Sequence, residues 1–219
     1  FDKVMEHTRE VLQRLDVSRA HIVGHSRGAL FAARLALEQP ERTRSLVILD
    51  TNTLAPEDPD FPSGAFYADL ERRMPAGPPT PDSARMEAVA NSYSGEHVTD
   101  DFVARMYAIA SLPKTQDARE RMKSLNQGQW TLGLNRRREE TLRTIEEHGF
   151  SVPTLMAWGF NDPSAPLHLG LRLLDLVTRK TTRTELHVFN RAGHYSFREH
   201  VDGFNRLLAG FCLGEKTDL

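Results

Sequence analysis

The fold of this protein is decided by the run AHIVGHSRGALFAARLALE, residues 20–38. Its first four residues form a short apolar run, which predicts a buried β-strand. Residues 29–38 are rich in Ala and Leu, which favours a helix, and Pro40 is expected to stop that helix. A second apolar run, SLVILD at 45–50, predicts another buried strand. A strand, a helix and a strand at this spacing indicate a βαβ unit, in which the two strands are parallel.

The motif Gly24-x-Ser26-x-Gly28 lies where the first strand gives way to the helix. The chain must turn sharply there, with the serine at the apex of a strained backbone, and small neighbours let the turn form without clashes. The helix N-terminus then lies beneath the serine, where its free backbone N–H groups stabilise developing negative charge. Because the motif joins an apolar strand to an Ala-rich helix, it indicates a nucleophilic Ser26.

After a long interruption, the chain returns to alternating strands and helices. Residues 51–83 are rich in proline and lack clear periodicity, so we expect an irregular connection, and residues 84–148 are mostly helical in pattern. Apolar runs at 152–158 and 184–189 predict two further strands. We therefore expect an α/β core, a mostly parallel sheet flanked by helices, with a helical lid. The expected parts are a core segment at 1–54, a lid or cap insertion at 55–145 and a second core segment at 146–219.

A nucleophilic serine needs a base, and the base needs a carboxylate that orients it. His194 is the best candidate for the base, because it follows the last predicted strand in a loop that opens onto the final helix. The other eight histidines lie within predicted strands or helices, past that loop, or beside the serine itself. Asp50 and Asp162 each follow a predicted strand, so either could orient the base. Each could instead cap the turn or helix that follows it.

The composition bounds the class of protein. A chain of 219 residues with 39% hydrophobic and 26% charged residues can build one globular domain with a sizeable core. The net charge of -2 provides no field that would draw the chain to nucleic acid or to an anionic membrane. No run of 18 apolar residues predicts a transmembrane helix, and Cys212 is the one cysteine, which favours the cytoplasm. No metal-ligand cluster or phosphate loop is apparent. We therefore expect a small-molecule substrate and no metal or other cofactor. The sequence leaves open whether the protein forms a homodimer.

Three segments carry a family resemblance: WGFND and PLHLGLRLL at 158–162 and 166–174, LHVFNRAGH at 186–194, and VARMYAI at 103–109. They resemble the acid loop with its helix, the histidine loop and the lid helix of the meta-cleavage product hydrolases. These enzymes belong to the α/β-hydrolase superfamily and act on 2-hydroxy-6-oxo-dienoates in aromatic degradation. The likeness extends over roughly residues 1 to 213, and the acid and histidine loops are its most specific parts.

The resemblance implies an α/β-hydrolase fold and hydrolytic C–C cleavage of the EC 3.7.1 type. It implies Ser26 as the nucleophile at the 6-oxo carbon, His194 as the group that moves protons, and Asp162 as the acid. The backbone N–H of Arg27 would stabilise the oxyanion. By the same resemblance Arg105 would clamp the substrate carboxylate, since a guanidinium matches it bidentately. Arg105 could equally be a solvated lid residue.

The sequence departs from the family at three positions near the expected pocket. The family often has Asn before the serine and Met after it, and Trp after the catalytic histidine; here these residues are His25, Arg27 and Tyr195. His25 and Tyr195 are therefore candidate substrate contacts, and the substituent of the substrate stays open. A carboxylesterase or lactonase with the same triad is an alternative, and Arg105 discriminates, because an ester needs no carboxylate clamp. A non-catalytic binding protein with a truncated hydrolase fold is another.

The family begins with about four more strands than this chain contains. We expect those N-terminal strands, and a loop that supplies half of the oxyanion hole, to lie outside the sequence. The strand that carries Ile22 and Val23 would then have a free edge. The 219-residue chain expressed by itself is expected to be poorly soluble or self-associated, and nearly inactive.

Overall fold

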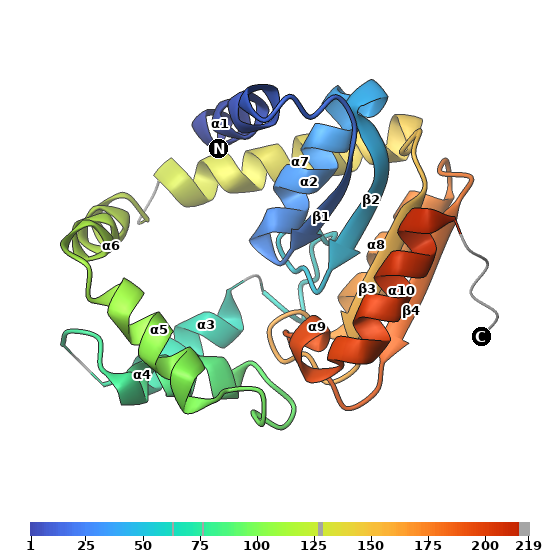
Figure 1. The fold of residues 1–219 in the computed structure, drawn as a ribbon. Helices are drawn as coiled ribbons and strands as arrows, with labels where there is room; N and C mark the ends of the chain where they lie inside the picture. The colour runs from blue at the N-terminus through green and yellow to red at the C-terminus, as the bar shows by residue number, and fades with distance from the viewer. Residues whose placement is uncertain (63, 76, 127–128, 215–219) are drawn as a thin grey trace.

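A parallel β-sheet lies at the centre of the computed structural model, which describes residues 1–62, 64–75, 77–126 and 129–214 (Figure 1). The strands run in the order β1-β2-β3-β4, and every neighbouring pair is parallel. Their bounds are Ala20–His25, Thr43–Leu49, Thr154–Gly159 and Thr184–Phe189. The α/β fold expected from the apolar runs is therefore confirmed, including all four strands.

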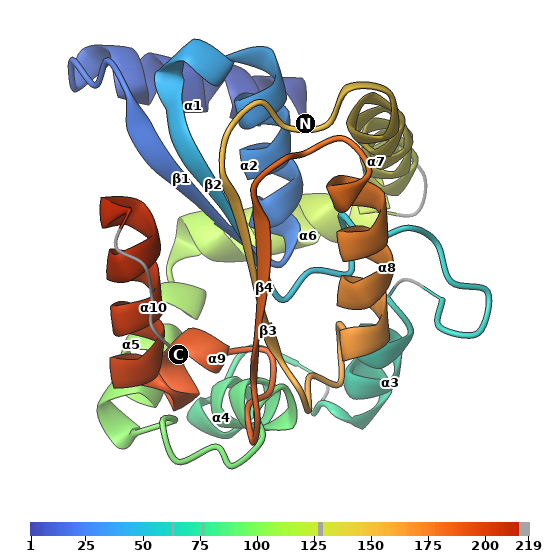
Figure 2. The same ribbon diagram turned by 90° about the vertical axis from the view of Figure 1, so that its right-hand side faces the viewer.

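Helices cover both faces of this sheet, and the alternation of side chains along β2 explains how (Figure 2). Leu46 and Ile48 point to one face and belong to the core built with α2 and α8. Val47 and Leu49 point to the other face and pack in the core with α10. The bounds of the covering helices are Arg27–Glu38 for α2, Leu167–Thr178 for α8 and Val201–Leu213 for α10, with the short α9 at Ser196–Glu199.

Among the described residues, five helices separate β2 from β3: α3 (Ala65–Arg73), α4 (Pro81–Ala90), α5 (Asp100–Ala110), α6 (Pro113–Asn126) and α7 (Gln129–His148). We call α3 to α6 the cap; in Figure 1 it lies to the left of and below the sheet. The expectation of an irregular connection at 51–83 is wrong for α3. Its prolines flank this helix instead of interrupting it, and Gly64 begins it with a φ of 85°.

Helix α7 joins the cap to the core. Its C-terminal half packs against the sheet core, where Ile145 is fully buried and Leu142 is partly buried. The expected lid boundary at residue 145 thus falls inside a helix whose last turns belong to the core. The division into lid and core segments stays a prediction.

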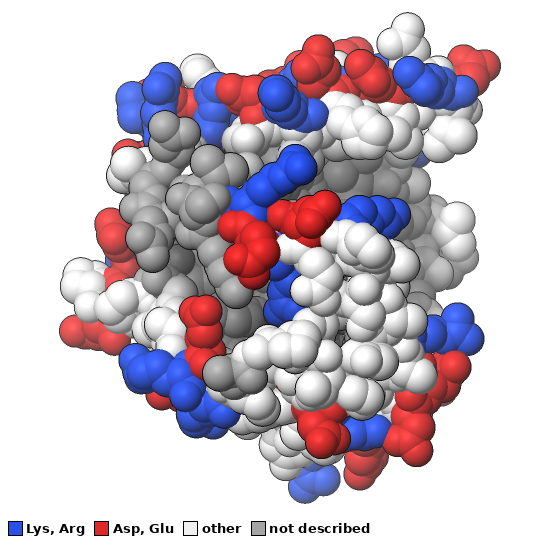
Figure 3. Space-filling view, turned by 90° about the vertical axis from the view of Figure 1, so that its left-hand side faces the viewer, with Lys and Arg blue, Asp and Glu red and all other residues white. Residues whose placement is uncertain are grey.

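Helix α1 (Asp2–Arg14) lies across α2 and α7. The Phe1 ring stacks on the Phe31 ring of α2 with centroids 4.5 Å apart, and Asp2 forms an ion pair of 2.7 Å with Arg137 of α7. In the view of Figure 3, basic and acidic side chains alternate along the upper edge of the molecule, where α1 lies. A short 3₁₀-helix, Pro40–Arg42, precedes β2. None of the helices in the described part of the chain is long and apolar enough to cross a membrane.

Candidate active site

Ser26 stands at the junction of β1 and α2 and has the strained backbone that the motif requires. Its φ of 54° lies in the left-handed region, which a non-glycine residue rarely adopts. Its N–H donates to the Leu49 carbonyl of β2 at 2.9 Å. A Cβ on Gly24 would lie 2.6 Å from the Ala32 Cβ and from the Gly28 carbonyl oxygen. Strand and helix therefore approach too closely for a side chain at Gly24, and the turn has the form of a nucleophile elbow.

His194 is paired with Asp162, and both side chains are almost completely buried. The distance between His194 Nδ1 and Asp162 Oδ2 is 2.7 Å. The other carboxylate oxygen accepts hydrogen bonds from the Ser164 and Ala165 N–H groups, both at 2.8 Å, and from the Ser164 hydroxyl at 3.0 Å. These donors fix the carboxylate, and the carboxylate fixes the orientation of the ring.

Asp50, the other candidate acid, has different partners. Its two oxygens accept from the Gly159 N–H and from the Ser196 hydroxyl, each at 2.7 Å. Burial, followed by the nearby Asp162, raises the pKa of Asp50 well above its usual value. Asp50 thus ties the ends of β2 and β3 to α9, while Asp162 is the carboxylate hydrogen-bonded to the histidine.

Ser26 and His194 line the same cavity, whose volume is about 580 Å³. Its other lining residues come from the ends of β2 and β3, from α2 to α4 and from α7: Arg27, Asn52, Thr53, Gly64, Phe66, Tyr67, Glu87, Trp130, Thr131, Leu134, Asn135, Arg138 and Ser164. Within the described residues, the Ser26 hydroxyl and the His194 ring are not hydrogen-bonded to each other. In free enzymes such bonds are often long and shorten when substrate binds.

His25 supports His194 and does not line the cavity of Ser26. Its Nε2 lies 2.7 Å from the His194 carbonyl oxygen, and the two rings pack with centroids 4.6 Å apart. Burial, followed by the neighbouring His194, lowers the pKa of His25 to about 4. The ring is therefore neutral near pH 7 and donates its Nε2–H to the carbonyl.

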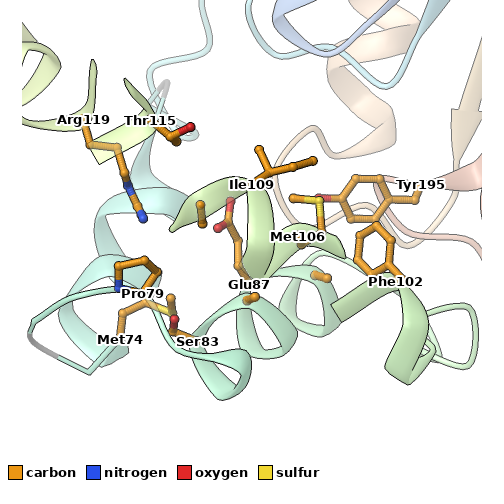
Figure 4. Close-up of a pocket in the computed structure, with 13 residues that line it drawn as sticks. Met74, Pro79, Ser83, Glu87, Phe102, Met106, Ile109, Thr115, Arg119 and Tyr195 are labelled. Carbon is orange, nitrogen blue, oxygen red and sulfur yellow. The ribbon is translucent and has the colours of Figure 1, made fainter. Parts of the chain in front are cut away.

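Tyr195 lines a second cavity, of about 300 Å³, which lies within the cap (Figure 4). Phe102 and Met106 of α5 lie beside the tyrosine, while Glu87 and Arg119 approach from α4 and α6. Burial raises the pKa of Tyr195 to about 12, so the phenol stays protonated. Tyr195 thus lines the cap cavity and is not among the lining residues of the Ser26 cavity, although its ring lies beside the His194 ring, with centroids 5.6 Å apart.

Arg105 is not brought to either cavity. It lies on α5 with a side chain that is 76% exposed, and its Nε pairs with Asp101 Oδ2 at 2.8 Å, one helical turn away. This i,i+4 pair holds the guanidinium on the solvent face of the helix. In this structure Arg105 is therefore a solvated residue of the cap, which is the alternative to a carboxylate clamp.

Sequence analysis did not identify Arg138, which lines the cavity of Ser26 and is 6% exposed. A signal was nonetheless present, because Arg138 shares a helical stripe with Leu134, Leu142 and Ile145. An arginine within an apolar stripe points toward the interior. Loop residues such as Asn52 and Thr53 carry no comparable pattern.

Backbone contacts tie the histidine loop to the cap. The His194 N–H donates to the Asn91 carbonyl at 2.8 Å. The carboxylate of Glu199 accepts from the Gly193 N–H at 2.6 Å on one side, and from the N–H groups of Tyr93 at 2.8 Å and Ser94 at 3.1 Å on the other. The segment after α4 and the histidine loop are therefore held together.

Among the residues that the structure covers, no group of three or more His, Cys, Asp or Glu side chains could hold a metal ion.

The sequence matches the family model described as alpha/beta hydrolase fold over residues 1–201. It is 31% identical over 211 residues to a 2-hydroxy-6-oxononadienedioate/2-hydroxy-6-oxononatrienedioate hydrolase of Cupriavidus pinatubonensis, covering 92% of this chain and 64% of the relative. A protein of the same name from Pseudomonas putida is 30% identical over 204 residues, covering 92% of this chain and 65% of that protein. The chain thus spans less than two thirds of the length of these relatives.

Solved structures also share the fold, and two of them illustrate it. A variant of a meta-cleavage product hydrolase from Pseudomonas fluorescens superposes with a TM-score of 0.70 at 24% identity, covering 96% of this chain and 70% of that one. The 2-hydroxy-6-oxo-6-phenylhexa-2,4-dienoate hydrolase of a Rhodococcus species gives a TM-score of 0.66 at 20% identity, covering 94% of this chain and 68% of that one.

Proposed function

Because the chain belongs to the alpha/beta hydrolase fold family, we propose that the protein is a serine hydrolase that cleaves a C–C bond in a 2-hydroxy-6-oxo-dienoate. The observation that carries the proposal is the buried His194–Asp162 pair, 2.7 Å between Nδ1 and Oδ2, on the cavity that also holds the strained Ser26. The names of the relatives from Cupriavidus pinatubonensis and Pseudomonas putida support this class of substrate.

In the proposed reaction Asp162 accepts the Nδ1–H of His194, which leaves Nε2 free to take a proton. His194 first helps to move the proton of the 2-hydroxyl group to carbon 5, because the resulting keto group can accept the electrons of the bond that breaks. Ser26 then adds to the 6-oxo carbon as its proton passes to His194. The backbone N–H of Arg27, at the start of α2, stabilises the oxyanion. Cleavage of the C5–C6 bond and attack by water complete the hydrolysis.

The test uses the complete protein and follows the loss of the dienoate's visible absorbance. We expect Ser26→Ala and His194→Ala to lower kcat by about 1,000-fold or more, since each removes a group that acts in the chemical step. Ser111→Ala, at the exposed end of α5, is the control and should leave kcat unchanged.

The choice of acid is tested in the same assay by a matched pair of isosteric changes. Asp162→Asn should lower kcat by about 1,000-fold or more, because the amide cannot hold the same tautomer of His194. Asp50→Asn should retain more than about a tenth of the activity, since its partners are Gly159 and Ser196. A larger loss for Asp50→Asn than for Asp162→Asn would instead identify Asp50 as the carboxylate that orients His194. Rapid turnover of aryl esters with none of the dienoate would instead favour a carboxylesterase.

A further inference from the structure

Arg138 is a buried cation with no partner in the described part of the chain. Its residue exposure is 6%, its Nε is buried without a hydrogen-bond acceptor, and its guanidinium forms no ion pair with any described carboxylate. The adjacent arginines differ: Arg136 and Arg137 both pair with Glu140, at 2.9 and 2.8 Å. Helix α7 thus pairs Arg136 and Arg137 and leaves the inward Arg138 without a partner among the described residues.

The unpaired guanidinium lines the cavity of Ser26 and His194. A buried charge is stable only where an opposite charge or several hydrogen bonds compensate it. No described side chain supplies that compensation. Glu87, the carboxylate on the cavity wall, is exposed and forms no ion pair with Arg138. An anion bound in the cavity would supply the compensation that the described residues lack.

The wall of α7 around Arg138 adds further donors. Asn135 also lines the cavity and lies three residues before Arg138, so the two side chains are neighbours on one helical face. The indole N–H of Trp130, on the same wall, is likewise buried without an acceptor. A wall that offers unpaired N–H donors matches a ligand rich in acceptor oxygens. A guanidinium fork fits a carboxylate best, because two parallel N–H···O bonds can form.

We propose that Arg138, with Asn135 beside it, is an anion subsite of this cavity and binds a carboxylate of the substrate. The inference rests on the proposed function for the identity of the substrate, and it moves the recognition of the carboxylate from the exposed Arg105 to α7. A dienoate carries a carboxylate on carbon 1, and a dienedioate carries a second one at the far end of the chain. The two carboxylates have the same chemistry, and the experiment below distinguishes which of them Arg138 binds.

The complete protein is assayed with 2-hydroxy-6-oxo-6-phenylhexa-2,4-dienoate, a monocarboxylate, and with 2-hydroxy-6-oxononadienedioate, a dicarboxylate. Arg138→Gln should lower kcat/KM by about 10- to 150-fold, the cost of a lost charged hydrogen bond. A loss with both substrates assigns Arg138 to the carbon-1 carboxylate, and a loss with the dicarboxylate alone assigns it to the distal one. Arg136→Gln, exposed on the same helix, is the control and should change kcat/KM less than about twofold. Unchanged kcat/KM for Arg138→Gln with both substrates, or a loss for Arg105→Gln instead, overturns the proposal.

A binding measurement keeps this test independent of the reaction. Glutarate is titrated calorimetrically into the wild type and into Arg138→Leu. We expect the affinity to fall at least about tenfold in the variant while Tm stays equal or rises, because a buried unpaired charge has been removed. Weaker glutarate binding together with an equal or higher Tm excludes unfolding as the cause of the lost affinity. Equal affinity, or no saturable binding to the wild type, overturns the subsite. Glutarate binding without turnover of either dienoate overturns the proposed function and leaves the subsite standing.

Discussion

Asp50 and Asp162 are two buried carboxylates close enough to influence each other, and their partners separate their roles. Asp162 accepts hydrogen bonds from two backbone N–H groups and a hydroxyl, and it pairs with His194 as well. Asp50 accepts from one backbone N–H and one hydroxyl. Fewer donors and complete burial leave the ionised form of Asp50 poorly compensated, which is why its pKa is raised.

The raised pKa of Asp50 predicts how stability depends on pH. A carboxyl group whose folded pKa is raised stabilises the fold fully below its unfolded pKa, about 3.9, and that contribution is lost as the pH rises through the folded pKa. Asp50→Asn mimics the protonated form, because its amide accepts from Gly159 N–H and donates to Ser196. We expect the variant to match the wild type near pH 4 and to gain at least about 1 kcal/mol over it by pH 7. Urea unfolding at several pH values measures this difference, and parallel stability curves would contradict it.

At the scale of elements, the two glycines of the serine motif have different reasons to be there. A Cβ on Gly24 would meet the Ala32 Cβ and the Gly28 carbonyl oxygen at 2.6 Å, so β1 and α2 would have to separate. A Cβ on Gly28 would meet nothing within 4 Å.

These contacts predict opposite effects on stability. We expect Gly24→Ala to lower the free energy of unfolding by about 3 kcal/mol or more, since overpacking against backbone cannot relax cheaply. Gly28→Ala should be neutral or stabilise α2 by about 0.5–1 kcal/mol, because alanine favours helix. Urea unfolding of the two variants provides the measurement. Equal losses of stability in the two variants would show that the cost does not come from the close approach of strand and helix at Gly24.

We call the three hydrogen bonds from the N–H groups of Gly193, Tyr93 and Ser94 to the Glu199 carboxylate the Glu199 clip. It predicts a link between the cap and His194. Glu199→Gln leaves one acceptor oxygen and turns an amide N–H₂ toward backbone donors, so at least one N–H loses its partner. We expect a loss of about 1–3 kcal/mol in stability and a lower kcat, because Gly193 directly precedes His194. Glu147→Gln, 58% exposed on α7, is the matched control and should change neither quantity. Lower stability with an unchanged kcat would mean that the clip does not position His194.

At the scale of the whole molecule, β1 forms one edge of the sheet in the described part of the chain. Strands β2 and β3 are buried almost throughout, whereas β1 pairs only with β2 among the described residues. Val23 of β1 points to the face that carries α10 and is 46% exposed. An unpaired strand edge with an exposed apolar side chain is a template for pairing with another chain.

We therefore expect the 219-residue chain expressed by itself to self-associate through β1. Val23→Lys should raise the monomer fraction, because a charge on an edge strand opposes pairing. Val4→Lys on α1 is the control, since Val4 is 43% exposed but lies on a helix. Size-exclusion chromatography with light scattering over a concentration series gives the answer. A wild-type chain that stays monomeric at every concentration would contradict the expectation.

The sequence by itself determined the parallel strands, the helix after Ser26 and the turn between them. These features follow from local patterns, because apolar runs, Ala-rich segments and a small-x-Ser-x-small turn act over a few residues. Helix α3 escaped prediction because its prolines lie just outside it, where they bound a helix as readily as they break one.

The local sequence patterns left open which of two aspartates pairs with His194, although the family resemblance implied Asp162, and only the tertiary structure shows which arginine faces the cavity. Asp50 and Asp162 both follow strands, and their long-range partners differ: Asp50 accepts from Ser196 of α9, whereas Asp162 pairs with His194, and the fold brings each partner from a distant part of the chain. Arg105 and Arg138 both lie on helices, and the face that each helix turns inward depends on what packs against it. A hydrogen-bond partner or a buried face is a property of segments that meet in space, and the spacing of residues along one chain does not specify it.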